Sequence, residues 1–396
     1  MEMLSVLLRV LSLALFKAEY REEVSNHVDL LAEAKAQSVF PIVYSAISEK
    51  CDLSKFMPLY YSMLSQNIQV IEEHKNIHKL LSENNIPYVF LKGCASARYY
   101  PDPLLRTMGD VDLLILPQDT EKADKLLTSN GFKKFADSEN EEIHIAYKSE
   151  SGVICELHRK INGIPKNEVG QKIYRYLSDI IENSVLVDNE FICPNDFHHG
   201  LILLLHTASH LTKEGVGLRH LCDWAVFVEK FSEQEFCGTF KNALKEIGLW
   251  KFACVLTACC VKYLGCEPKE WTGAVSETLI DGIIEDIFAG GNFGKKDYSR
   301  YQQIKYISDS KNHEISKSHP VLQVFKNLIS KAKSKKLVKK NIIFLPLGCA
   351  WVSFNYLLLI FTGKRKLDSK KAIEDARKRK NIYSEFKLFE TQQNTN

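Results

Sequence analysis

The sequence predicts an α/β segment in the middle of the chain, with helical regions on both sides of it. Between residues 81 and 165, short runs of β-branched and aromatic residues alternate with a helical stretch, which is typical of a mixed sheet carrying helices. Outside that segment the apolar residues recur mostly at helical spacing. The expected division is an N-terminal helical region over 1–80, the α/β segment over 81–165, a helical domain over 195–270 and a C-terminal helical region over 271–396.

The composition is that of an ordinary globular protein with room for two or three domains. Of 396 residues, 45% are hydrophobic and 26% are charged, and the net charge of +3 says little about binding partners. None of the 11 cysteines stands in a zinc-like spacing, which favours scattered thiols in a reducing compartment. We therefore expect a cytoplasmic protein.

The N-terminal region reads as a succession of helices. Met3 to Phe16 is apolar, but no small-residue cleavage site follows it, so an amphipathic helix is favoured over a signal peptide. Helical spacing then continues over 28–81, where Pro41 and Pro58 mark expected breaks. We expect these helices to form a layer that packs on the α/β segment.

The α/β segment begins with a short buried strand and a helix. Ile86 to Leu91 reads as the strand, which stops at Lys92-Gly93, and Cys94 to Tyr100 reads as the start of a helix. A glycine at a strand exit lets a backbone approach a phosphate closely. A second helix is expected over Gln118 to Asn130, stopped by Gly131.

Acidic residues interrupt two of the apolar strands. Because side chains alternate between the faces of a strand, Asp110 and Asp112 share one face, and two carboxylates that close require a cation. Further strands are expected at 132–135, 143–148 and 153–158, and the last of these carries Glu156. Beside the Asp pair, Glu156 would complete a site of three carboxylates.

These motifs together resemble a known superfamily. The matching residues are Leu91-Lys92-Gly93, Tyr100-Pro101-Asp102-Pro103, Arg106, Gly109-Asp110-Val111-Asp112-Leu113-Leu114, Gly131-Phe132, Glu156-Leu157-His158, Leu204-Leu205-His206-Thr207-Ala208-Ser209-His210 and Leu221-Cys222-Asp223. Over roughly Leu81 to Lys230, the chain resembles nucleotidyltransferases with a polymerase-β-like palm. It is most similar to a poorly characterised bacterial branch known as nucleotidyltransferase family proteins.

The resemblance implies a palm flanked by helical domains, and a transferase of phosphorus-containing groups. It implies that Asp110, Asp112 and Glu156 hold Mg²⁺ or Mn²⁺, and that a nucleoside monophosphate passes from an NTP such as ATP to a hydroxyl-bearing acceptor. Better-known members follow the first strand with Gly-Ser, whose hydroxyl and backbone hold the triphosphate. Here the chain reads Lys92-Gly93-Cys94-Ala95, a departure that bears on the nucleotide grip.

Three residues near the acidic strand are candidates for nucleotide binding: Lys92, Gly93 and Arg106. Arg106 could bind a triphosphate through its bidentate guanidinium; the alternatives are a solvated loop arginine or a pair with Asp102. Lys92 could contact phosphate or form a structural ion pair.

Histidines supply candidates for the substrate cleft. His158 shares a strand face with Glu156, where it could orient a metal ligand, touch substrate or be a half-buried hydrogen-bonded residue. His206 and His210 lie four apart on a helix expected from about 197 to 211, capped by Asn195 or Asp196. They could bind metal, line the cleft or sit in the core beside an acid such as Asp223, which itself looks buried and needs a partner.

The C-terminal region offers further alternatives. A glycine-rich loop at 288–297 could cradle phosphate, but no buried strand leads into it. Lys326 to Lys340 is basic and is best read as a solvated helix face. Ile342 to Thr362 lacks charge, so it could span a membrane, touch a membrane surface with its basic flanks, or form a buried or partner-facing helix.

Two function classes follow from these observations. The first is an NTP-dependent nucleotidyltransferase whose acceptor is open: a small molecule, a sugar, a peptide or a protein side chain. The sequence argues against nucleic acid, because the basic residues cluster in the distal tail. The second is a catalytically weak or inactive nucleotide-binding or interaction protein, which the missing Gly-Ser favours.

Overall fold

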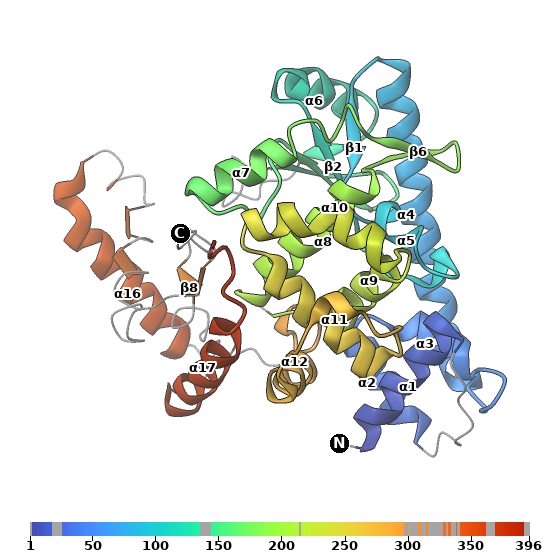
Figure 1. The fold of residues 1–396 in the computed structure, drawn as a ribbon. Helices are drawn as coiled ribbons and strands as arrows, with labels where there is room; N and C mark the ends of the chain where they lie inside the picture. The colour runs from blue at the N-terminus through green and yellow to red at the C-terminus, as the bar shows by residue number, and fades with distance from the viewer. Residues whose placement is uncertain are drawn as a thin grey trace.

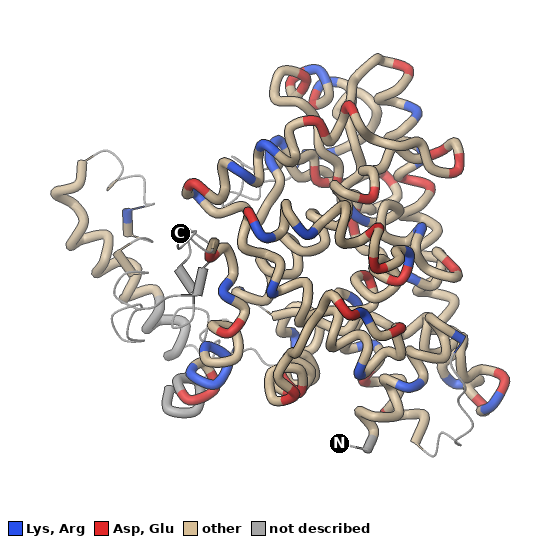
Figure 2. Tube along the Cα trace, in the orientation of Figure 1, with Lys and Arg blue, Asp and Glu red and all other residues tan. Residues whose placement is uncertain are grey.

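The computed structural model describes residues 2–17, 26–134, 144–213, 215–296, 300, 308–309, 314–315, 328–329, 332–333, 338, 341–361 and 369–391. A small mixed sheet lies at one end, beside the long helix α4 (Met57–Glu83), and a body of helices lies next to the sheet (Figure 1). Acidic and basic residues are interspersed over both parts (Figure 2). This mixed sheet with many helices is compatible with an α/β nucleotidyltransferase fold.

Within the described residues, the main sheet has five strands in the order β1-β2-β5-β4-β3. The strands are β1 (Tyr88–Phe90), β2 (Asp110–Ile115), β3 (Lys133–Lys134), β4 (His144–Lys148) and β5 (Ile154–His158). Only the central pair β2 and β5 is parallel, while the outer pairs are antiparallel. The predicted strands at 86–91, 143–148 and 153–158 are confirmed with slightly shorter bounds.

The two faces of this sheet do different things. Val111 and Leu113 of β2 are fully buried in a core shared with α4 and with α6 (Thr120–Ser129). The alternate residues Asp110, Asp112 and Leu114 lie on the other face, which turns toward the helical body. The acidic residues are thus on the face of the sheet that meets the helices.

The remaining helices and short strands have the following bounds. They are α1 (Glu2–Phe16), α2 (His27–Ala36), α3 (Phe40–Ile47), α5 (Cys94–Ala97), α7 (Glu168–Tyr176), α8 (Asp196–Leu211), α9 (Leu218–Val228), α10 (Glu233–Glu246), α11 (Trp250–Leu264), α12 (Glu277–Gly290), α16 (Leu345–Phe361) and α17 (Ser369–Ser384), with strands β6 (Val185–Val187), β7 (Phe191–Cys193), β8 (Ser308–Asp309) and β9 (Glu314–Ile315). Single 3-10 turns are η1 (Ser54–Phe56), η2 (Pro103–Leu105), η3 (Pro117–Asp119), η4 (Glu270–Thr272), η5 (Asn292–Gly294) and η6 (Ile342–Phe344).

Helix starts and stops follow the sequence signals closely. The Asn195 side chain accepts a hydrogen bond from the His198 N–H at 2.9 Å and caps α8, as predicted. Gly131, with φ of +86°, follows α6 where the stop was expected. Pro41 and Pro58 stand in the first turns of α3 and α4, so each marks a new helix.

The layer of N-terminal helices divides between the two parts of the molecule. Val70, Ile77 and Leu81 of α4 belong to the core under the sheet, as predicted for this layer. In contrast, α1, α2 and α3 pack mainly into the helical body, where α1 contacts α11. The predicted packing on the α/β segment therefore holds most clearly for α4.

The loop expected from residue 288 begins later than predicted. Helix α12 continues to Gly290 because Leu279, Ile283 and Ile287 are buried at helical spacing. The chain then turns at Gly291, whose φ is +65°. The turn η5 follows.

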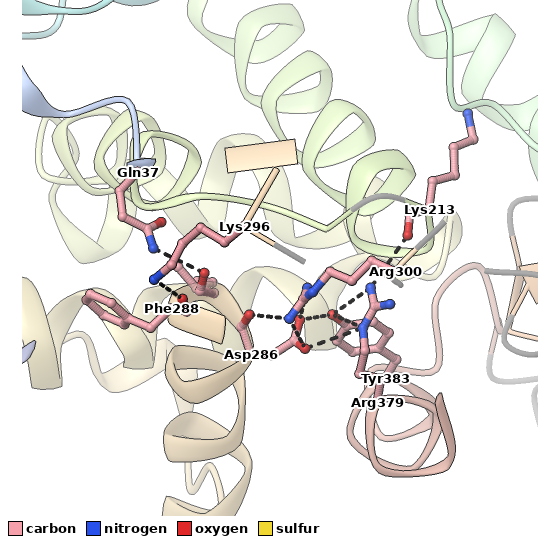
Figure 3. Close-up of polar contacts among 9 residues, drawn as sticks. Gln37, Lys213, Asp286, Phe288, Lys296, Arg300, Arg379 and Tyr383 are labelled. Carbon is pink, nitrogen blue, oxygen red and sulfur yellow. Dashed lines mark hydrogen bonds and ion pairs between the residues drawn. The ribbon is translucent and has the colours of Figure 1, made fainter. Parts of the chain in front are cut away.

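A buried ionic cluster attaches α17 to α12 (Figure 3). Arg300 holds both carboxylate oxygens of Asp286, at 2.8 and 3.1 Å. From α17, Tyr383 donates a hydrogen bond to Asp286 and Arg379 Nε lies 3.3 Å from it. The Arg379 guanidinium also reaches the backbone carbonyl of Lys213, just after α8. The C-terminal helix is thereby joined to the segment that follows α8.

The apolar segment near the C-terminus forms η6 and α16 and exposes large side chains. Ile343, Leu347 and Trp351 are 73%, 64% and 58% exposed, which contradicts the buried alternative. No helix in the described part of the chain is both long and apolar enough to cross a membrane. Membrane-surface contact and a partner-facing role stay predictions, and the basic segment 326–340 falls largely outside the described residues.

Candidate functional site

A cavity of about 710 Å³ lies between the acidic face of the sheet and the helical body. Its lining on the sheet side includes Lys92, Gly93, Arg106, Asp110, Asp112, His144, Glu156 and His158. Its lining on the helical side includes His206, His210, Lys213, Arg219, Asp223 and Phe293. The structure therefore brings every predicted site residue to one cavity.

The three predicted carboxylates come together through strand register. Because β2 and β5 are parallel neighbours, Asp112 pairs directly with Glu156. Asp110 lies two residues before Asp112 on the same face. The negative charge of Asp112, followed by burial, raises the pKa of Asp110 to about 6. Repulsion within the acidic pair, which the sequence predicted, is thus present in the fold.

Asp112 is the most enclosed of these acids, at 1% exposure. Its Oδ2 lies 2.8 Å from Lys92 Nζ, and its Oδ1 lies 2.9 Å from His158 Nε2. Burial alone would raise the pKa of Asp112, but Lys92 and His158 outweigh it and hold that pKa well below its usual range. The predicted ion-pair alternative for Lys92 is shown, and its contact with phosphate stays a prediction.

Two histidines lie against Glu156. His158 Nε2 is 3.3 Å from Glu156 Oε2, and His144 Nε2 is 3.9 Å from Glu156 Oε1. Burial by itself lowers the pKa of His158, but the hydrogen bonds with Asp112 and Glu156 raise it above its ordinary value. Together, His144, Glu156 and His158 could hold a metal ion, since one ligand atom from each lies within 4.8 Å of the others. A potential metal site is therefore present beside the acidic pair.

Both the backbone conformation and the neighbouring side chains require glycine at position 93. Its φ is +63°, a conformation that favours glycine, and an added Cβ would lie 2.7 Å from Nε2 of the buried His74. The side chain of His74 therefore leaves no room for a Cβ at residue 93, just after β1. The predicted contact of Gly93 with a triphosphate stays a prediction.

Arg106 is buried, which contradicts the solvated alternative, and its partner is Asp223 rather than Asp102. Its Nε and Nη2 donate to Asp223 Oδ1 and Oδ2 at 2.7 and 2.8 Å. Tyr100 donates a third hydrogen bond to Asp223 at 2.7 Å. Asp223 thus has the partner that a buried acid needs. The arginine lies in the cavity lining, but its charge is already matched, and a contact with nucleotide stays a prediction.

The helical wall of the cavity carries a cluster of aromatic rings. The ring centroids of His206 and His210 lie 4.4 Å apart, and His220 lies 5.4 Å from His206. Phe293 of η5 packs 4.8 Å from His210. Burial, and then the charge of Lys92, keeps the pKa of His206 well below its usual value. Of the alternatives for His206 and His210, the structure favours the cavity-lining position.

A family model described as "Uncharacterised nucleotidyltransferase" matches residues 25–265 of this chain. The chain belongs to this nucleotidyltransferase family. A comparison with curated proteins found no significant match. The matched range contains the whole main sheet, the acidic face and the helices α8 and α9 that form the opposite wall.

The sequence did not predict two residues that line the cavity of this family member, Arg219 and Ser96. Arg219 of α9 donates from Nη1 to the Thr107 carbonyl at 3.1 Å, and its Nε, although buried, has no hydrogen-bond partner among the described residues. The Ser96 hydroxyl on α5 is likewise buried and unpartnered within the described ranges, and it also lines the cavity. Only the three-dimensional fold places them there, since neither stands in a spacing that signals a site.

Proposed function

We propose that this protein transfers a nucleoside monophosphate from an NTP to a hydroxyl group of an acceptor, with the help of a divalent cation. The observation that supports this most strongly is the convergence of Asp110, Asp112 and Glu156 on one cavity of a chain that belongs to a nucleotidyltransferase family. The sheet would serve as the palm. The two helical regions would serve as the flanking domains.

The residues at the acidic face fit a cation. The raised pKa of Asp110 reports an excess of negative charge at that carboxylate, which makes no ion pair or hydrogen bond with the residues described. Asp110, Asp112 and Glu156 would hold Mg²⁺ or Mn²⁺. Such a cation would lower the pKa of an acceptor hydroxyl and neutralise charge on the α-phosphate and the leaving pyrophosphate.

Cationic and polar side chains would position the triphosphate. Lys92 lies at the sheet edge of the cavity with 24% of its side chain exposed, so it can meet solvent and a phosphate while it stays near Asp112. Arg219 adds a guanidinium whose Nε donates no hydrogen bond to any described residue. The Ser96 hydroxyl would replace the serine that follows glycine in better-known members. Arg106 would support this arrangement by fixing Asp223.

The acceptor would enter along the helical wall. If Glu156 does not bind the cation, it would accept the proton of the acceptor's hydroxyl group. His206 and His210 line that wall and would contact the acceptor, His206 as a neutral imidazole because burial keeps its pKa well below its usual value. A small molecule, a sugar, a peptide and a protein side chain all remain within this proposal.

Pyrophosphate release tests the proposal. The full chain is incubated with each of the four common NTPs, Mg²⁺ or Mn²⁺, and a mixture of hydroxyl compounds. We expect release with at least one NTP and its loss in Asp110→Asn and Glu156→Gln. The matched control is Glu121→Gln, because Glu121 is an exposed acid on α6, 81% exposed. NTP binding without pyrophosphate release would favour the inactive nucleotide-binding alternative.

A further inference from the structure

The imidazoles of His144 and His158 give the acidic face a different donor chemistry from three carboxylates alone. His144 on β4 is the direct register partner of His158 on β5, so both rings lie on the face that carries Glu156. The ring centroids lie 5.1 Å apart. Adjacent strands thereby supply two nitrogen ligands beside an oxygen ligand.

Two of the donor separations are close to those that one bound ion requires, and a third is longer. Metal bonds of about 2.0–2.2 Å to nitrogen and oxygen place neighbouring ligand atoms roughly 3.0–3.5 Å apart. In the protein, His158 Nε2 lies 2.9 Å from Asp112 Oδ1 and 3.3 Å from Glu156 Oε2. His144 Nε2 lies 3.9 Å from the other oxygen of Glu156. Small side-chain movements would close the set around an ion.

The set is also well enclosed. His144 and His158 are 8% and 4% exposed, so little water competes for their nitrogens. Mg²⁺ prefers oxygen ligands and gives up its water reluctantly, whereas imidazole is a preferred ligand of Zn²⁺ and neighbouring transition metals. The burial and the nitrogen donors therefore point to the same class of ion.

We propose that His144, Glu156 and His158, with Asp112 beside them, bind one transition-metal ion that favours imidazole, such as Zn²⁺, in preference to Mg²⁺. This inference deepens the proposed function by naming the cation class of the same face. It concerns binding alone, so it can hold even if nucleotidyl transfer fails. Asp110 lies outside the set and would stay available for a nucleotide-associated ion.

Co²⁺ is a suitable probe because its visible spectrum reports nitrogen and oxygen ligation, while a sulfur charge-transfer band would reveal binding at a cysteine. The metal-stripped full chain is titrated with Co²⁺ in the presence of a thousandfold excess of Mg²⁺, without nucleotide. Stoichiometry is measured by equilibrium dialysis with Co²⁺ and with Zn²⁺. We expect one ion per chain and a visible band without the sulfur signature.

Variants then locate the ion. His144→Gln and Glu156→Gln should weaken Co²⁺ binding at least about tenfold, whereas His210→Gln on the opposite wall should bind as wild type does. Thermal unfolding and circular dichroism check that each variant folds. His158→Gln should weaken Co²⁺ binding in the same way, and if that variant does not fold, His144→Gln alone tests the proposal. Three results would each overturn the proposal. They are displacement of Co²⁺ by Mg²⁺ at similar concentrations, a spectrum that shows only the sulfur band, and a Co²⁺ affinity of His144→Gln equal to that of wild type. Absent pyrophosphate release with intact Co²⁺ binding would reject the proposed function and leave the metal site standing.

Discussion

Arg106 and Asp223 form a buried bidentate ion pair between residues 117 positions apart, with both N···O distances below 2.9 Å. The arginine lies just before the acidic strand and the aspartate lies on α9, so the pair ties the sheet to the helical wall across the cavity. Burial alone would lower the pKa of Arg106, but the charge of Asp223 and its hydrogen bond raise that pKa above its ordinary value. The pair therefore joins the two walls of the cavity.

Loss of this pair should be costly. Arg106→Ala leaves Asp223 buried without its charge partner, and we expect a loss of about 3–5 kcal/mol in the free energy of unfolding. The measurement is denaturant unfolding at neutral pH. Lys125→Ala is the control, because Lys125 pairs with Glu121, the two side chains are 75% and 81% exposed, and such surface pairs contribute about 1 kcal/mol or less. Equal losses in the two variants would show that the pair does not carry the sheet-to-helix contact.

The two aspartates of the acidic strand should respond to substitution in opposite directions. In chelator, Asp110→Asn should stabilise the protein at pH 7.5 by about 1–2 kcal/mol, because it removes a carboxylate whose pKa is raised to about 6 by Asp112. Asp112→Asn should destabilise it by about 3 kcal/mol, because Lys92 and His158 lose their anionic partner. The sequence indicates only the repulsion between the two aspartates, because the pairing of Asp112 with Lys92 and His158 depends on the fold.

The pH dependence gives the Asp110 prediction a second readout. A carboxyl group with a raised folded-state pKa stabilises the fold fully below its unfolded value near 3.8, and that contribution is lost as pH rises through about 6. The advantage of Asp110→Asn over wild type should therefore be absent near pH 4, grow between pH 4 and 6, and level off above pH 7. Unfolding curves across this range decide it. An advantage that is constant with pH would mean that Asp110 carries no electrostatic strain.

Arg219 should affect nucleotide binding more than stability. Its single described hydrogen bond, to the Thr107 carbonyl, is part of the cavity wall, while its Nε has no described partner. We expect Arg219→Ala to weaken binding of a non-hydrolysable NTP with Mg²⁺ about tenfold, and to change unfolding free energy by about 1 kcal/mol or less. Calorimetric titration measures the first effect. Arg175→Ala, an exposed change on α7, should leave affinity unaltered. If Arg219→Ala lowers the free energy of unfolding strongly but leaves the affinity for the NTP unchanged, Arg219 supports the fold and does not bind nucleotide.

Much of the fold and the acidic face could be predicted because the signals are local. Strand alternation places Asp110 and Asp112 on one face, and the Asn195 cap and Gly131 stop fix helix ends within a few residues. Glu156 is recognisable as an acid within an apolar strand, and the parallel register of β2 and β5 brings it beside Asp112.

The partners across the cavity could not be predicted, since they depend on packing between distant segments. Nothing in the loop before β2 indicates that Arg106 meets Asp223 rather than Asp102. His144 becomes significant only when the antiparallel register of β4 and β5 sets it opposite His158. Phe293 reaches the site just after α12, whose last residues fall within the predicted loop at 288–297.

The central claim is that the α-phosphate, with its nucleoside, is the group transferred. The most direct measurement follows the preferred NTP labelled separately at the α- and γ-phosphorus, incubated with the full chain, divalent cation and an acceptor mixture. We expect α-label to enter a new product while γ-label leaves as pyrophosphate, and we expect Asp110→Asn and Asp112→Asn to abolish both. Label from the γ-phosphorus on the acceptor, or α-label transfer that persists in both variants, would contradict it.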